Sequence, residues 1–551
     1  MADRISYFRQ KGDPYILMTS LALILSLGMV IFIVIIILVN GLGFFWPRAL
    51  VEVTLKNNEI YLGEPWAKGT VSNVDEVGNN VQVEEFQIKK GNRDIYGNDF
   101  AWLIKAKVIK ETYPENATTF ERYEYGNFYG FITALNNLDT MITASAPGFF
   151  KRVNQTHQSA LERKDKIEDL ESKLNDLVAP LTKMQREISL LQINVSSQTQ
   201  EQKLQLEELR SKAQALEEKI TPAYQQLSDQ MSKLKQENQK LFVKVRTAEG
   251  REVEIQLANV VRLYQPNRMN VLEKSSLYAS KLCEFVSADP RESNTEGGVF
   301  PAIFGTVMMV LLMSIAVVPF GVLAALYLHE YATQGTVIRL IRLSVNNLAG
   351  VPSIVFGIFG LGFFIYVVGG TIDQLFFSSK LPEPTFGTGG ILWASLTLAL
   401  LTLPVVVVAT EEGILAVPRA NKEGALALGA TRWQMIRKIV LPNAMPGILT
   451  GLILAISRGA GEVAPLMITG VVKLAPSLPV DGTFPFLHLD RKFMHLGFHI
   501  YDVGFQSPNV EAAKPMVYST ALLLILIVVI LNLLAIYLRN RLRKKYKTSA
   551  F

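Results

Sequence analysis

The sequence predicts an all-α membrane protein with six transmembrane helices and a mixed α/β domain outside the membrane. Six stretches are apolar and about as long as the roughly 20 residues that cross a bilayer as a helix. A polar segment, residues 48–294, separates the first stretch from the other five. Basic residues gather at one set of membrane flanks, and the 551-residue chain carries a net charge of +6.

The first apolar stretch, residues 15–39, is expected to anchor the chain. It is too long for the core of a signal peptide, and no small-residue cleavage site follows it. The other predicted spans are residues 299–328, 343–368, 391–409, 445–471 and 516–538. Six crossings place both termini on one side of the membrane.

The distribution of basic residues predicts which side that is. One side carries the N-terminus, Arg339 and Arg342, the loop 411–446 and the tail 539–547. The short loops on the other side hold few basic residues: Lys380, Lys473, Arg491, Lys492 and Lys514. Basic loops stay in the cytoplasm, so we expect cytoplasmic termini and a periplasmic insert in a bacterial inner membrane. Basic residues beside apolar spans indicate contact with membrane lipid rather than nucleic acid.

The first part of the insert is expected to be rich in β-strands. Residues 51–55, 81–88, 101–108 and 120–133 alternate β-branched or aromatic residues with charged ones, as half-buried strands do. After residue 242 a β-hairpin is expected, with its turn at Glu249 and Gly250.

The middle of the insert, about residues 157–242, predicts an antiparallel coiled-coil hairpin. Two helical arms carry apolar residues at alternating spacings of three and four, and a short polar turn at 195–201 joins them. Pro180 and Pro222 are each expected to kink one arm. The pattern leaves two roles open: a solvated spacer, or an arm for docking or oligomerisation. The arm positions are Ile167, Leu170, Leu174, Leu177, Leu181, Met184, Ile188 and Leu191, then Leu206, Leu209, Ala213, Leu216, Ile220, Ala223 and Leu227.

The loop 411–446 carries a motif with fixed spacings. Its positions are Glu423, Gly424, Ala425, Gly429, Ile439, Leu441 and Pro442. The pattern resembles the EAA loop of ABC-transporter permeases, with Gly424 in place of the middle alanine. The resemblance implies a short coupling helix that sits in a groove of a separate ATPase subunit. A glycine turn with small residues before it lets a helix approach a partner closely.

Together with this loop, the spans resemble the phosphate-specific ABC permeases, and among them the PstA branch. The resemblance rests on GGVFPAIFGT, FGVLAALYLHEYA, NNLAGVPSIVFGIFG and SRGAGEVAPLMITG, and it leaves the insert uncovered. It implies a MetI-like permease core that imports inorganic phosphate. It also implies three partners: a PstC-like permease, PstB-like ATPase subunits and a periplasmic phosphate-binding protein.

Arg458 and Glu462 are the candidate residues of the substrate path. Charge at membrane depth is costly, so such residues usually face a cavity or a partner. At i and i+4 the two would share one face of a helix and could pair. The planar fork of arginine suits phosphate. The alternative is a structural ion pair between helices, and these residues alone do not separate phosphate from other oxyanions.

The sequence favours neither an enzyme nor a metal site. It contains no Walker A pattern and no arrangement of nucleophile and base, and the single cysteine excludes an internal disulfide. The outer loop holds His488, His495, His499, Asp490 and Asp502, but two histidines four residues apart are weak evidence for a metal site. No cofactor is expected. The alternative functions are a permease for sulfate or molybdate, and a membrane-anchored coiled-coil scaffold or sensor.

These observations divide the chain into four parts. Residues 1–47 form the cytoplasmic N-terminus and first span, and residues 48–294 form the insert. Residues 295–540 form a permease domain of five helices with the coupling loop, and residues 541–551 form a basic cytoplasmic tail.

Overall fold

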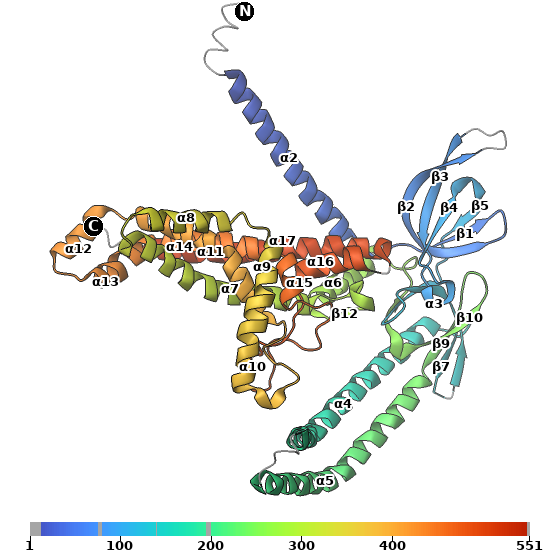
Figure 1. The fold of residues 1–551 in the computed structure, drawn as a ribbon. Helices are drawn as coiled ribbons and strands as arrows, with labels where there is room; N and C mark the ends of the chain where they lie inside the picture. Colours follow the sequence, from blue (N-terminus) through green and yellow to red (C-terminus); the bar gives the residue numbers. More distant parts are fainter. Residues whose placement is uncertain (1–12, 75–79, 139, 194–199, 508, 548–551) are drawn as a thin grey trace, which may run out of the picture. The chain divides into compact units, whose positions relative to one another are not determined.

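The computed structural model describes residues 13–74, 80–138, 140–193, 200–507 and 509–547. The chain divides into two compact units. The membrane unit comprises Met1–Phe45 with Leu282–Phe551, and the insert unit comprises Trp46–Lys281 (Figure 1). The second boundary falls inside helix α6 (Val271–Ser287), which the sequence analysis did not predict.

The described part of the membrane unit contains six helical segments long and apolar enough to cross a bilayer, as predicted. The first and the last are the helices α2 (Asp13–Gly43) and α17 (Val510–Lys547), which, like the fourth, are uninterrupted. Helix α7 (Phe300–Leu326) continues into a π-helical turn, Tyr327–Tyr331. The third segment is built from α9 (Ser353–Phe359), a π-helical stretch (Gly360–Gly369) and α10 (Gly370–Phe376), and the fourth is α11 (Ile391–Leu415). The fifth consists of α13 (Arg432–Met435), a π-helical turn (Ile436–Val440) and α14 (Leu441–Gly459).

The third span differs from the prediction of residues 343–368. A separate amphipathic helix, α8 (Thr336–Leu348), comes first, and the membrane helix begins only at Ser353. Pro352 explains the break, because it lacks a backbone N–H and pushes the preceding residue out of the helical region. The predicted stretch therefore joined the end of one helix to the start of another.

The fifth span also differs from the prediction of residues 445–471. It begins with α13 and ends at Gly459, where a turn leads into the short helix α15 (Ala464–Thr469). Two local features explain this end. Gly461 lies in the turn, and Pro465 stands in the first turn of α15, where proline favours a new start.

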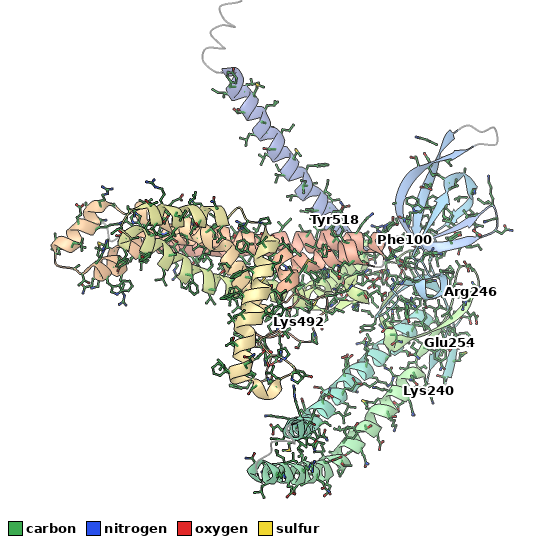
Figure 2. All side chains as sticks on the ribbon, in the orientation of Figure 1. Phe100, Lys240, Arg246, Glu254, Lys492 and Tyr518 are labelled. Carbon is green, nitrogen blue, oxygen red and sulfur yellow. The ribbon has the colours of Figure 1, made fainter. Side chains whose placement is uncertain are left out.

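Small residues bring the helices of the membrane unit close together. A Cβ atom built on Gly447 of α14 would lie 2.6 Å from the Cα atom of Gly413 on α11. Backbone contact of this kind is typical of packed membrane helices. Near the C-terminal end of α2, the hydroxyl of Ser519 on α17 donates a hydrogen bond of 2.8 Å to the carbonyl oxygen of Gly41. Tyr518, next to Ser519, is labelled in Figure 2.

The insert unit contains two antiparallel sheets. The first has the order β4-β3-β2-β1-β5, and the second β10-β9-β7-β6-β11 with β8 paired to β7. The first five strands are β1 (Val51–Leu55), β2 (Ile60–Val74), β3 (Asn80–Lys89), β4 (Phe100–Ile104) and β5 (Val108–Thr112). The others are β6 (Ala117–Arg122), β7 (Phe128–Asn137), β8 (Thr140–Thr143), β9 (Phe242–Arg246), β10 (Glu252–Gln256) and β11 (Val260–Tyr264).

The predicted strands are right in part. Strand β1 is as expected, and the hairpin of β9 and β10 is confirmed, with Gly250 at φ +87° in its turn. The run 101–108 is wrong as one strand, because a 3-10 turn, Lys105–Lys107, divides it. The run 120–133 is divided by a turn in which Tyr125 and Gly126 have positive φ. Strand β2 was not predicted, because Pro65 and two glycines interrupt its alternation of apolar and polar residues. At Pro65 the register between β2 and β3 shifts.

Two long helices of the insert, α4 (Phe149–Ile193) and α5 (Gln200–Gln239), pack against each other. Leu181, Ala213 and Ile220 form the centre of their apolar seam, and Lys235 of α5 bridges Glu171 of α4 at 2.7 Å. Both helices continue through their prolines, and Figure 1 shows each changing direction along its length. The coiled-coil geometry stays a prediction, and most of the predicted turn lies outside the described residues. Figure 2 labels Lys240, Arg246 and Glu254 near the base of the hairpin.

The remaining elements are short. They are α3 (Arg93–Tyr96), β12 (Pro290–Arg291), β13 (Glu296–Gly297), α12 (Arg419–Ala427) and α16 (Leu496–Tyr501), with 3-10 turns at Leu257–Asn259, Glu292–Asn294 and Ser378–Lys380 and a π-helical turn at Asp502–Gln506.

Candidate functional site

Two consecutive capping motifs shape the coupling loop. Helix α12 ends in a Schellman motif: the amide of Ala430 donates to the carbonyl of Ala425 at 3.1 Å, and the amide of Gly429 donates to Leu426 at 3.0 Å. Gly429 has φ +83°, which glycine adopts without strain. Thr431 then caps α13 and forms a reciprocal capping box with Gln434. The sequence GATRWQ therefore encodes a sharp turn between two helices.

The loop has a buried face and an open face. Ala425 packs into a core with Met435, Ile436 and Val440, next to α7 and α11. Of the other predicted residues, Ile439, Leu441 and Pro442 are half-buried where the loop joins α14.

The open face carries the remaining predicted residues, Glu423, Gly424 and Gly429. A Cβ atom on either glycine would meet nothing within 4 Å, and Leu428 beside them is 91% exposed. This face combines a large apolar side chain with bare backbone. It is therefore shaped to receive a closely packed partner.

The structure brings Arg458 and Glu462 together, but in a different way from the prediction. Arg458 lies in the last turn of α14, whereas Glu462 lies in the turn before α15, so the two do not share a helix face. The Nε atom of Arg458 is 4.0 Å from the Oε1 atom of Glu462. The side chains are 32% and 22% exposed, so this chain covers neither completely.

Two spans hold the turn that carries these charges. The hydroxyl of Ser457 exchanges hydrogen bonds with the amide group of Asn532 on α17, at 2.8 and 3.1 Å. Gly459 packs against Met313 of α7, whose sulfur lies 2.5 Å from the Cβ position of that glycine. Arg458, between these two anchors, therefore has a fixed backbone and a partly open side chain.

Two of the predicted histidines, His495 and His499, are buried, and His499 lies in a polar cluster with Asp502. Asp502 Oδ2 accepts a hydrogen bond from Asn294 at 3.2 Å and lies 3.3 Å from Lys473 Nζ. His495 accepts the amide of Gly497 at 3.1 Å, and His499 lies 3.4 Å from the Thr520 hydroxyl.

Burial lowers the pKa of His495 and that of His499 to about 4; around His499, Asp502 opposes the shift and Lys473 adds to it. In the described part of the chain, no three side chains of the His, Cys, Asp or Glu type come together as metal ligands would. The other two residues of this loop, His488 and Asp490, lie elsewhere, and His488 pairs with Asp481 at 3.0 Å.

Glu330 is a functional candidate that the sequence analysis did not single out. It lies in the π-helical turn that follows α7, and its Oε1 atom accepts a hydrogen bond of 2.6 Å from Lys422 of the coupling loop. Its only signal in the sequence is a carboxylate directly after an apolar span, in YLHEYA.

Comparisons with known proteins identify the family. Residues 317–547 match the family model described as "Binding-protein-dependent transport system inner membrane component". The probable ABC transporter permease protein YqgI of Bacillus subtilis is 30% identical over 268 residues, which are 48% of this chain and 84% of that protein. The phosphate transport system permease protein PstA 1 of Mycobacterium tuberculosis is 36% identical over 243 residues, 44% of this chain and 71% of that protein.

A solved structure of the inward-facing MetNI methionine ABC transporter aligns at 19% identity with a TM-score of 0.29, over 45% of this chain and 94% of that chain. The assignment does not rest on this likeness. It rests on relatives that share at least 30% of their residues with this chain over more than two thirds of their own length. The chain belongs to the inner membrane components of binding-protein-dependent transport systems, the permease subunits of ABC transporters.

Proposed function

We propose that this chain is the PstA-type permease subunit of an importer for inorganic phosphate. The observation that carries the proposal is its 36% identity to a phosphate permease across the spans and the coupling loop. Arg458 adds chemical support, because its guanidinium can donate paired hydrogen bonds to a tetrahedral oxyanion. Sulfate or molybdate import and a scaffold role have no comparable support.

A permease of this family works with ATPase subunits and a substrate-binding protein. We assign the ATPase contact to the open face of the coupling loop, where Gly424, Gly429 and Leu428 leave room for a partner. PstB-like ATPases, a PstC-like second permease and a periplasmic phosphate-binding protein complete the proposed complex. The chain contributes one half of the pore.

The charge distribution supports the proposed orientation. The insert unit carries 32 basic and 32 acidic residues, so the net charge of +6 belongs entirely to the membrane unit. Its basic residues gather at the coupling loop, α8 and the C-terminal tail. Basic flanks stay in the cytoplasm, which makes the insert and its helical hairpin periplasmic.

Arg458 has the stronger claim to the substrate path, and Glu462 is its orienting partner. The two charged atoms are 4.0 Å apart, which is long for an ion pair, and both side chains are partly exposed. Such a pair contributes only about 0–1 kcal/mol to stability, so a purely structural role gives little reason for two charges at membrane depth. A path for a charged ion does explain why two charges lie at this depth. Glu462 can also accept the proton of monohydrogen phosphate.

The test is phosphate uptake by the reconstituted complex. Arg458→Gln keeps the length and polarity of the side chain but removes its charge, and we expect uptake to be abolished while the subunits still assemble. Arg458→Lys should recover little, because an ammonium group lacks the planar fork. Sulfate and molybdate are offered to the wild type in parallel. Transport of either one in place of phosphate refutes the substrate.

The double substitution Arg458→Leu with Glu462→Leu separates the two roles. A structural ion pair tolerates replacement by two apolar residues, so uptake would return in the double variant. A substrate contact predicts an assembled but inactive complex. Restored uptake would therefore reject the role of Arg458 in the path.

A further inference from the structure

At the cytoplasmic end of α7, basic side chains from other elements donate hydrogen bonds to the last turn. A helix ends in carbonyl groups without partners and with partial negative charge, and the π-helical turn Tyr327–Tyr331 lies at this end. The guanidinium of Arg342, on α8, donates to the carbonyl oxygen of Leu328 at 3.2 Å. The other two cations, Lys422 and Arg432, come from the coupling loop.

Glu330 is the point where the coupling loop is attached. Lys422 Nζ donates to its Oε1 atom at 2.6 Å, and the two side chains are only 16% and 10% exposed. Arg432 donates to the backbone oxygen of Glu330 and stacks 5.2 Å from the ring centre of Tyr331. His329 Nδ1 lies 3.1 Å from the same carboxylate oxygen. Lys422 lies in α12 and Arg432 in α13, so the helices on both sides of the Gly429 turn contact the end of α7.

Helix α7 leads from these contacts to the candidate substrate path. Met313 packs on Gly459, the residue after Arg458. From Glu330 to Met313 the helix spans about 26 Å, at roughly 1.5 Å per residue. Helix α14 reaches the same turn directly, because it continues from the coupling loop. Both α7 and α14 therefore connect the loop to the Arg458 turn. The contacts at Glu330 join α7 to the loop from which α14 continues.

We propose that Glu330, Lys422 and Arg432 form a clamp that makes α7 follow the coupling loop when the ATPase moves it. Glu330 is a positioning residue: it contacts no substrate, and it keeps α7 and α14 in step so that the Arg458 turn changes as one piece. Without the clamp, the loop still docks on the ATPase through its open face, but α7 no longer moves with it. The proposal rests on the assignment of this chain as an ABC permease.

The first test measures uptake per ATP hydrolysed in the full complex in proteoliposomes. Glu330→Gln and Lys422→Met should each keep the ATPase bound and hydrolysing ATP while uptake per ATP falls by about tenfold. Lys438→Met is the matched control, because it removes an equal charge from an exposed position of the same loop and should leave the ratio unchanged. The exchange of Glu330→Lys with Lys422→Glu should restore most of the lost uptake.

A second readout needs no substrate. In a Cys283→Ser background, a spin label on Tyr327→Cys, which is 58% exposed, reports the movement of α7 when ATP is added. We expect an ATP-dependent spectrum with the clamp intact and none with Glu330→Gln. If the wild type fails to import phosphate but the label responds in this way, the substrate is wrong and the clamp stands.

Three results overturn the clamp. Unchanged uptake per ATP in both single variants means that α7 moves without it. Loss of ATPase binding together with uptake, in the single variants and in the charge exchange, means that the residues only shape the docking loop. An ATP-dependent label signal that persists in Glu330→Gln means that α14 alone carries the motion.

Discussion

Acidification should loosen the segment 493–506, which carries His495 and His499, before it affects the spans. Both imidazoles are buried, and burial lowers the pKa of each to about 4 from an ordinary 6.5. A lowered pKa means that the folded state keeps these rings neutral. Their contribution to stability is therefore complete above pH 6.5 and is lost as the pH falls toward 4.

The size of the effect follows from the two pKa values. At pH 5 the exposed ring is almost fully protonated and the buried ring is not, which costs about 2 kcal/mol per histidine relative to neutral pH. Two independent histidines give about 4 kcal/mol, or roughly a thousandfold increase in the opening of the segment. Lys473 and Asp502, which face His499 with opposite charges, leave the sign unchanged.

Hydrogen exchange of residues 493–506 in nanodiscs, at pH 7 and pH 5, measures this opening after correction for intrinsic exchange. The variant His495→Asn serves as the control: asparagine can still accept the amide of Gly497 as a helix cap, but it does not titrate. With His499→Asn added, the pH dependence should disappear. Equal protection of the wild-type segment at both pH values would show that these rings are not buried as neutral groups, and the reasoning would fail.

Two further predictions concern coupling and orientation. Gly429→Leu should abolish binding of the ATPase subunit while the permease still inserts, because leucine is strained at φ +83° and projects into the open face. Gly429→Asn should lose less binding, because asparagine tolerates this φ. Wild-type transport in both variants would show that the loop does not contact the ATPase. The exposed Cys283, the single cysteine, lies in α6, which joins the insert unit to the membrane unit. It should react with a membrane-impermeant maleimide added to intact spheroplasts, and labelling only in inverted vesicles would place α6 and the adjoining insert on the cytoplasmic side.

The sequence could predict the membrane helices because each is a long apolar run, and hydrophobicity alone decides whether such a run leaves water. Hydropathy alone does not show where a helix is interrupted. Residues 343–368 were predicted as one span although they contain Asn346, Asn347 and Pro352. The backbone breaks before Ser353, because Pro352 acts on the backbone and hardly changes the hydropathy. In the insert, β2 was missed for the related reason that Pro65 and its bulge interrupt the alternation.

The turn between α12 and α13 was predictable because its formation depends on local chemistry. Gly429 and the capping residues Thr431 and Gln434 are neighbours in the chain, so a short stretch of sequence determines the turn that they form. The clamp on Glu330 was not predictable in this way. Lys422 is 92 residues from Glu330, and only the packing of α7 beside the loop brings the two charges together.

The pair Arg458 and Glu462 shows how a correct proximity can come from a wrong local structure. The spacing of four predicted one rigid helix face, but Gly459 ends α14 and Glu462 lies in the following turn. In a helix the separation of the two charges would be fixed by the backbone. In a turn the carboxylate can move relative to the guanidinium without breaking helical hydrogen bonds, and a Cβ atom on Gly461 in that turn would meet nothing within 4 Å. A charge pair whose spacing can change is better suited to a path that must hold and then release an anion than to a permanent link between helices.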